Sequence, residues 1–146
     1  MKKTINIILV ILWMSLIFIL SSSNSNESNE QSGRIVTFIS QIFNISNIEM
    51  LNYVIRKIAH ITEFFVLGIL VMNLIHCYNK KTYIAIILCI IYAISDEFHQ
   101  SLVPGRSPQI YDVLIDTVGS SLGISIYKLL TKIANINKVK KKINKQ

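Results

Sequence analysis

The sequence contains few charged residues for its length. Of its 146 residues, 16% are Asp, Glu, Lys or Arg, whereas about a quarter of the residues in a soluble domain are charged. Hydrophobic residues make up 51% of the chain, and the mean hydropathy is +0.48. This composition argues against a soluble domain and favours a single polytopic membrane domain over residues 1–146.

Cysteine is also scarce, and several motifs of known chemistry are missing. Cys77 and Cys89 both lie in apolar runs and form no CxxC motif, so we expect reduced, packed thiols and no disulfide framework. The sequence lacks a serine nucleophile elbow and a glycine-rich phosphate loop. The ionisable side chains are therefore the candidates for chemistry.

Four apolar runs are long enough to cross a membrane, for which a helix needs about 20 residues. They cover residues 4–22, 58–77, 81–100 and 110–130. The first run follows two lysines as a signal peptide would, but further apolar runs come after it, so we predict an uncleaved transmembrane helix. The predicted fold is an all-α bundle of four transmembrane helices.

The connection after the first span is expected to contain a loop and a short helix. The Ser21–Gln31 segment is rich in Ser, Asn and Glu and is predicted to be an external loop. Apolar residues then recur at helical spacing, at Ile35, Phe38, Ile39, Ile42 and Phe43. This helix is too short to span, so we predict that it lies on the outer leaflet; packing over the bundle mouth is the alternative. Asn47 is predicted to cap a helix that continues into the second span.

The distribution of basic residues predicts that both termini are cytoplasmic. Lysine and arginine favour the cytoplasmic side of a membrane, and this orientation places Lys2, Lys3, the 79–81 turn and the basic tail at 131–146 inside. A basic tail can bind nucleic acid, but this tail follows an apolar helix. We therefore expect an anchor near anionic lipid and no nucleic-acid partner.

Ionisable residues gather at one end of three predicted spans, on the outer side in this topology. Residues three or four apart share a helix face, which gives three polar stripes: His60 with Glu63, Asp96 with His99 and Gln100, and Asp112 with Asp116. The apolar part of the third span, Tyr83–Ile94, covers only about 18 Å of a bilayer core of about 30 Å. The helix must then continue through its charged residues, which predicts a polar pocket sunk in the outer leaflet.

Three interpretations of these stripes stay open. The first is a structural ion-pair network, in which Arg56, Lys57, Arg106 and two histidines oppose five carboxylates and lock the helices together. The second is a divalent metal site of zinc, manganese or iron. Its expected ligands are His60, Glu63, Asp96 and His99, and Asp112 and Asp116 are further candidates. The third is acid–base catalysis, in which a histidine acts as base and a carboxylate orients it.

Two further motifs accompany the stripes. Pro104 and Gly105 predict a tight turn between the last two spans, and this turn would present Arg106 to a carboxylate or a phosphate. Gly119 and Gly123 form a GxxxG pattern in the fourth span. We expect this pattern to pack closely against another helix, within the chain or in self-association between copies.

In combination, these motifs resemble the VanZ-like family. The matching strings are His60-x-x-Glu63-Phe64 with Leu67-Gly68, Ser95-Asp96-Glu97-x-His99-Gln100, Pro104-Gly105-Arg106, and Asp112-x-x-x-Asp116-x-x-Gly119. The resemblance covers nearly the whole chain. It implies a bacterial cell-membrane protein, in a family whose founding member is associated with low-level resistance to the glycopeptide teicoplanin.

The resemblance and the polar stripes together give a functional hypothesis. We expect a protein that binds or acts on a cell-envelope lipid or lipid-linked precursor. The expected catalytic residues are His60, Glu63, Asp96, Glu97, His99 and Gln100, and the expected substrate-binding residues are Lys57, Arg106, Asp112 and Asp116. The alternative is a non-enzymatic protein that binds or shields an envelope component, with the charged cluster as a structural network.

Overall fold

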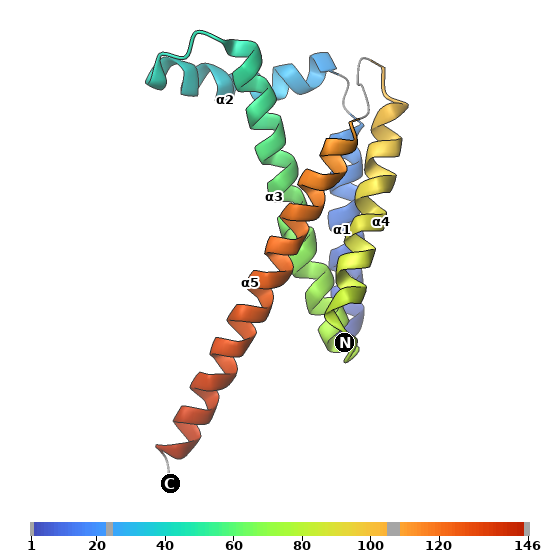
Figure 1. The fold of residues 1–146 in the computed structure, drawn as a ribbon, viewed down its shortest axis with the longest axis vertical. Coiled ribbons are helices and arrows are strands. Elements are labelled where there is room, and N and C mark those ends of the chain that lie inside the picture. The colour runs from blue at the N-terminus through green and yellow to red at the C-terminus, as the bar shows by residue number, and fades with distance from the viewer. Residues whose placement is uncertain (1, 23–24, 105–108, 145–146) are drawn as a thin grey trace.

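The computed structural model describes residues 2–22, 25–104 and 109–144, and all regular secondary structure within them is helical. The helices are α1 (Lys2–Ser21), α2 (Ser25–Phe43), α3 (Ile48–Cys77), α4 (Thr82–Ser101) and α5 (Ile110–Ile143) (Figure 1). All but α2 are long and apolar enough to cross a membrane. The predicted all-α fold with four membrane-spanning helices is confirmed.

Two of the long helices extend well beyond the predicted spans. Helix α3 begins at Ile48, directly after the predicted cap Asn47 and before the span predicted from residue 58, and α5 continues to Ile143 through the predicted tail. Their 30 and 34 residues correspond to about 45 and 51 Å at 1.5 Å per residue. The added segments contain Glu, Arg and Lys, which are good helix formers, so hydropathy marks the apolar part of each helix and not its ends.

The prediction of a loop over Ser21–Gln31 is wrong, because α2 begins at Ser25. Serine, asparagine and aspartate or glutamate are typical of loops, but they are also favoured where a helix starts. A Ser/Asn/Glu-rich composition therefore does not separate the two structures.

Helix α2 lies across the end of α3, away from the bundle axis (Figure 1). Ile35, Phe38, Ile42 and Phe43 on the predicted apolar face are all more than half exposed, whereas Val36, outside that face, is buried. Helix α2 has 19 residues, longer than predicted, but it is not apolar enough to span. Its uncovered row of aromatic and aliphatic side chains fits the predicted position on a membrane surface.

Asn47 caps α3 as predicted. Its side-chain oxygen accepts a hydrogen bond of 3.0 Å from the backbone nitrogen of Met50. The first backbone N–H groups of a helix have no partner inside the helix, so this bond stabilises the start of α3.

Replacing Asn47 with alanine is expected to lower the free energy of unfolding by about 1 kcal/mol, because the Met50 N–H loses its acceptor. Unfolding of the purified protein in detergent measures this. Ser46→Ala, at the exposed neighbouring position, is the matched control. An equal loss of stability in both variants would argue against the cap.

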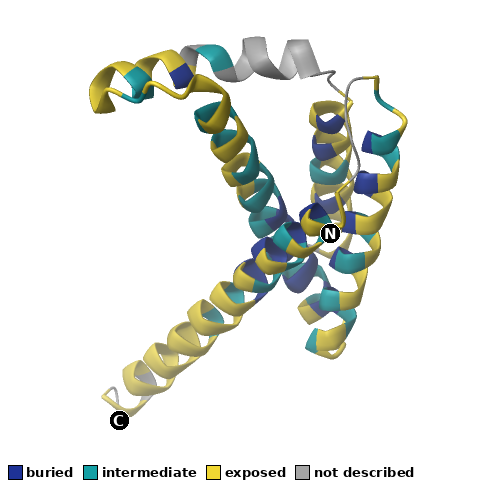
Figure 2. Ribbon diagram, turned by 45° about the horizontal axis from the view of Figure 1, so that its top comes forward, coloured by how far each residue is buried: buried dark blue, intermediate teal, exposed yellow. Residues whose placement is uncertain are grey.

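Helix α3 is the centre of the bundle and contacts each of the other four helices. It contributes the fully buried side chains of Phe64 and Leu67. Helix α4 contributes small residues four positions apart to the core, Ala85, Cys89 and Ala93, which are all buried. Buried residues gather where the helices cross, while the outward faces are exposed and apolar, as lipid contact requires (Figure 2).

Glycines bring α3 and α5 into backbone contact. A Cβ atom on Gly68 would lie 2.2 Å from the Ser120 carbonyl oxygen, and one on Gly123 would lie 2.0 Å from that of Phe65. The close packing expected of the GxxxG pattern is thus confirmed within the chain. Beyond this crossing α5 runs away from the other helices (Figure 1).

Candidate functional site

Side chains from three helices converge at the end of the bundle where α4 stops and α5 begins, here called the α4–α5 end. His60 of α3, Asp96 of α4 and Asp116 of α5 each offer one donor atom, and these atoms all lie within 4.8 Å of one another. We call these residues the three-helix cluster. A Cβ atom on Gly119 would lie 2.6 Å from the Ile61 carbonyl oxygen, so this glycine allows α5 to bring Asp116 beside His60.

Asp96 is buried, and neutral donors hold both of its carboxylate oxygens. Ser21 Oγ donates to Asp96 Oδ1 at 2.7 Å, and Gln100 Nε2 donates to Asp96 Oδ2 at 2.8 Å. Ser21 belongs to α1 and Gln100 lies one turn further along α4. The carboxylate is therefore fixed in orientation, and each oxygen keeps a lone pair for another partner.

Asp116 is the most buried carboxylate of the cluster, with 1% of its surface exposed. Its Oδ1 atom lies 3.7 Å from His60 Nδ1 and accepts no hydrogen bond from the described residues. Burying a carboxylate oxygen with no donor is costly. A proton or a cation between the side chains of the cluster would remove that cost.

Lys57 and Asp112 form a separate ion pair beside the cluster, between α3 and α5. Lys57 Nζ also lies 5.0 Å from the centroid of the Tyr53 ring. These contacts support the structural interpretation for this pair of residues. They also place a lysine near the cluster at the position where substrate binding was predicted.

Glu97 faces a different neighbour from Asp96, because adjacent residues on a helix point about 100° apart. Its Oε1 atom accepts a 2.6 Å hydrogen bond from the backbone nitrogen of Gln109, the residue before α5. Glu97 is buried, and its Oε2 atom has no hydrogen-bond partner in the described part of the chain. This carboxylate thus ties the start of α5 to the end of α4.

Two of the four predicted metal ligands are not part of the three-helix cluster. His99 turns toward α1, where its ring stacks on Phe18 with centroids 4.0 Å apart and its Nε2 atom lies 3.0 Å from Ser22 Oγ. Glu63 is partly buried on α3, and its backbone carbonyl accepts a 2.9 Å hydrogen bond from Trp13 Nε1. Asp116, a further candidate ligand that was also predicted to bind substrate, is the third residue of the cluster. Arg106 and the turn at 105–108 lie outside the described residues.

The role of the last residues of α1 was not predicted. Ser21 and Ser22 end an apolar run, a position typical of helix ends and loops, and nothing in that pattern identifies their partners. In the structure they contact Asp96 and His99, so α1 closes one side of the site.

A second polar network, also not predicted, lies at the opposite end of the bundle. Asn6 Nδ2 donates to Cys77 Sγ at 3.1 Å. Asn73 Nδ2 donates to Asn6 Oδ1 at 3.3 Å, and the Tyr127 hydroxyl donates to Asn73 Oδ1 at 3.0 Å. The Tyr127 hydroxyl has a single proton, so His76 Nδ1, at 3.1 Å from it, must be the donor in that contact. The network joins α1, α3 and α5.

The donor set of the three-helix cluster is suited to two kinds of chemistry. One imidazole nitrogen and two carboxylates are ligands for zinc, manganese or iron, and three protein ligands leave positions open for a substrate. Without a metal ion, a histidine between two carboxylates can take up and release a proton. The cluster offers two buried carboxylates beside a partly buried histidine for either chemistry.

Comparison with known proteins gives a family match. The family model described as VanZ/LLP1 matches residues 6–131, a range that includes the whole three-helix cluster and most of each long helix. No curated protein and no solved structure matches the chain.

Proposed function

The chain belongs to the VanZ/LLP1 family, as its motifs indicated, and we propose that this multi-pass membrane protein binds or acts on a cell-envelope lipid or lipid-linked precursor. The observation that carries the proposal is the burial of Asp96 and Asp116 beside His60, on three different helices. Ionisable groups in membrane helices are costly, so they usually mark a functional site.

The proposed site lies on the cell-wall side of a bacterial membrane. Three groups of lysines are remote from the cluster. They lie at the N-terminus, in the turn between α3 and α4, and along the end of α5. Since cytoplasmic segments are enriched in lysine, these residues support cytoplasmic termini. The α4–α5 end then lies in the outer leaflet, at the depth of lipid headgroups.

A divalent metal ion fits the three-helix cluster. His60 and the two aspartates would hold it, and it would polarise a phosphoryl or carbonyl oxygen of the lipid headgroup. The bonds from Ser21 and Gln100 to Asp96 are the kind of contact that orients a ligand carboxylate. Glu63 and His99, which were also predicted as ligands, would act on the substrate from beside this centre.

The remaining predicted residues would position the headgroup. Lys57 can pair with a phosphate in exchange for Asp112, its partner in the structure, and Arg106 would add a bidentate contact. Glu97 would keep α4 and α5 together through its bond to Gln109.

Susceptibility to teicoplanin tests the proposal in a sensitive bacterium that expresses the chain. We expect the wild type to raise the inhibitory concentration, and His60→Gln or Asp96→Asn to remove that increase at unchanged protein level in the membrane. Glu49→Gln, which makes the same carboxylate-to-amide change at an exposed position, should retain it. Full protection by His60→Gln and Asp96→Asn would refute a functional role for the cluster.

A non-enzymatic binder is the second candidate, favoured by the Lys57–Asp112 ion pair and the hydrogen-bonded Asp96. Asp96→Glu separates the two, because catalysis depends on geometry within a fraction of an ångström whereas shielding tolerates a longer carboxylate. A second measurement is mass spectrometry of the extracted envelope lipids. If the protein is an enzyme, cells that express the wild type should contain a new lipid species; if it only binds, they should not.

A further inference from the structure

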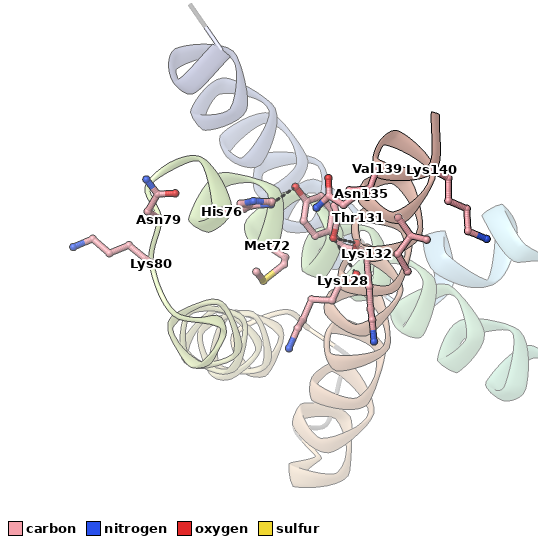
Figure 3. Close-up of a pocket in the computed structure, with 12 residues that line it drawn as sticks. Met72, His76, Asn79, Lys80, Lys128, Thr131, Lys132, Asn135, Val139 and Lys140 are labelled. Atoms are coloured by element: carbon pink, nitrogen blue, oxygen red, sulfur yellow. Dashed lines mark hydrogen bonds between the residues drawn. The ribbon is translucent and has the colours of Figure 1, made fainter. Parts of the chain in front are cut away.

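A groove lies at the end of the bundle opposite the three-helix cluster. It has a volume of about 620 Å³ and lies between the end of α3, the turn after it and α5 from Tyr127 to Lys140 (Figure 3). The groove is a consequence of the crossing at Gly119 and Gly123. Two straight helices that touch at one point must diverge on either side of it, and α5 runs away from the other helices here (Figure 1).

The lining of the groove is amphiphilic. Met72, Ile136 and Val139 supply its apolar surface, and Thr131 and Asn135 supply neutral polar groups. Its charged residues are all cations: Lys80, Lys128, Lys132 and Lys140.

The positive charge of the groove is uncompensated. The sequence contains no Asp or Glu after Asp116, and none between Glu63 and Asp96, so none of the segments that form the groove supplies an acid. Lys128 and Lys132 are one helical turn apart, and their side chains extend on the same side of α5 (Figure 3). Like charges at this spacing repel each other, and an anion between them would remove the repulsion.

One wall of the groove is held in place by hydrogen bonds. His76 lines it and donates to the Tyr127 hydroxyl, which in turn donates to Asn73. The ring of His76 also packs edge-on against that of Tyr127, with centroids 5.9 Å apart. The base of α5 is therefore fixed against α3, and the groove is a formed feature of the bundle and not merely a flexible lysine tail.

From this combination we infer that the groove binds one anionic phospholipid from the leaflet at this end of the bundle. Lys128 and Lys132 contact the phosphate-bearing headgroup, and Met72, which lies within the membrane-spanning part of α3, contacts the apolar part of the lipid. A soluble anion would leave the apolar surface uncovered, and a zwitterionic lipid would leave the lysines without a net counter-charge. The inference does not depend on the proposed function of the three-helix cluster or on the orientation of the chain.

The test is binding of phosphatidylglycerol to the full chain in detergent, measured by native mass spectrometry. Removing Lys128 or Lys132, as Lys128→Gln or Lys132→Gln, is expected to weaken binding about fivefold each, the effect of one lysine near an anionic headgroup. Lys141→Gln is the matched control, because Lys141 lies on the same helix but does not line the groove. Its effect should stay below about twofold.

Three results would overturn the inference. The first is an equal loss of lipid affinity in all three lysine variants, which would mean that the lipid is attracted to the positive charge of the whole tail and not to the groove. The second is equal affinity for phosphatidylcholine, which would remove the role of net charge. The third is displacement of the lipid by inorganic phosphate at a concentration equal to that of the lipid, which would indicate a site for a free anion.

Discussion

Replacing Gly123 with alanine is expected to break the contact between α3 and α5 and to destabilise the protein by more than about 3 kcal/mol, the upper end of usual overpacking. The new methyl group would lie 2.0 Å from the Phe65 carbonyl oxygen and 3.2 Å from the Ile69 nitrogen. Both atoms belong to the backbone of α3, so no side-chain rotation can relieve the clash. The two helices would have to move apart.

Gly33→Ala is the matched control, because a Cβ atom at Gly33 of α2 would meet nothing within 4 Å. Alanine is favoured over glycine in a helix by about 0.5–1 kcal/mol, so this variant should be unchanged or slightly more stable. Thermal unfolding of both proteins in the same detergent measures the difference. Equal transition temperatures would show that α3 and α5 do not pack through these glycines.

The second large effect is expected from Asp116→Asn, which keeps the shape of the side chain and removes its charge. If the three-helix cluster holds a divalent ion, the affinity for zinc should fall more than about 100-fold, since losing a residue that only orients a ligand already costs about 10- to 100-fold. Zinc retained by the purified protein, titrated against a chromophoric chelator, gives the affinity.

Stability of the same variant should change in the opposite direction. Without metal, the Asp116→Asn protein is expected to be more stable than the wild type by about 1–2 kcal/mol, because a buried carboxylate oxygen with no donor has been neutralised. Glu49→Gln should alter neither property. The metal site would be contradicted if the wild type does not bind zinc, or if Asp116→Asn leaves the zinc affinity unchanged. The lipid proposal is tested separately, by teicoplanin susceptibility.

The helices and their polar stripes could be predicted from the sequence because both depend on local spacing. The pair Asp96 and Gln100, four residues apart, is hydrogen-bonded on α4, as expected of one helix face. The wrong prediction of a loop over Ser21–Gln31, where α2 begins at Ser25, also has a local cause, since polar helix formers and loop formers overlap in composition.

Contacts between helices could not be predicted in the same way. They depend on where two helices cross and how each is rotated, and neither quantity is visible in a single sequence. His99 and Asp116 illustrate this, because both lie on predicted polar stripes, yet His99 turns toward Phe18 of α1 and Asp116 turns toward His60 of α3.

The bonds that α1 makes also determine when during synthesis the site can be completed. Ser21 and Trp13 are synthesised well before their partners Asp96 and Glu63, which follow 75 and 50 positions later in the chain. Helix α1 must therefore wait in the membrane, with these two donors unengaged by the bundle, until α3 and α4 have been inserted. Helix α1 thus reaches its final place only after α4 has been made, and completion of the site is a late event in the biogenesis of the protein.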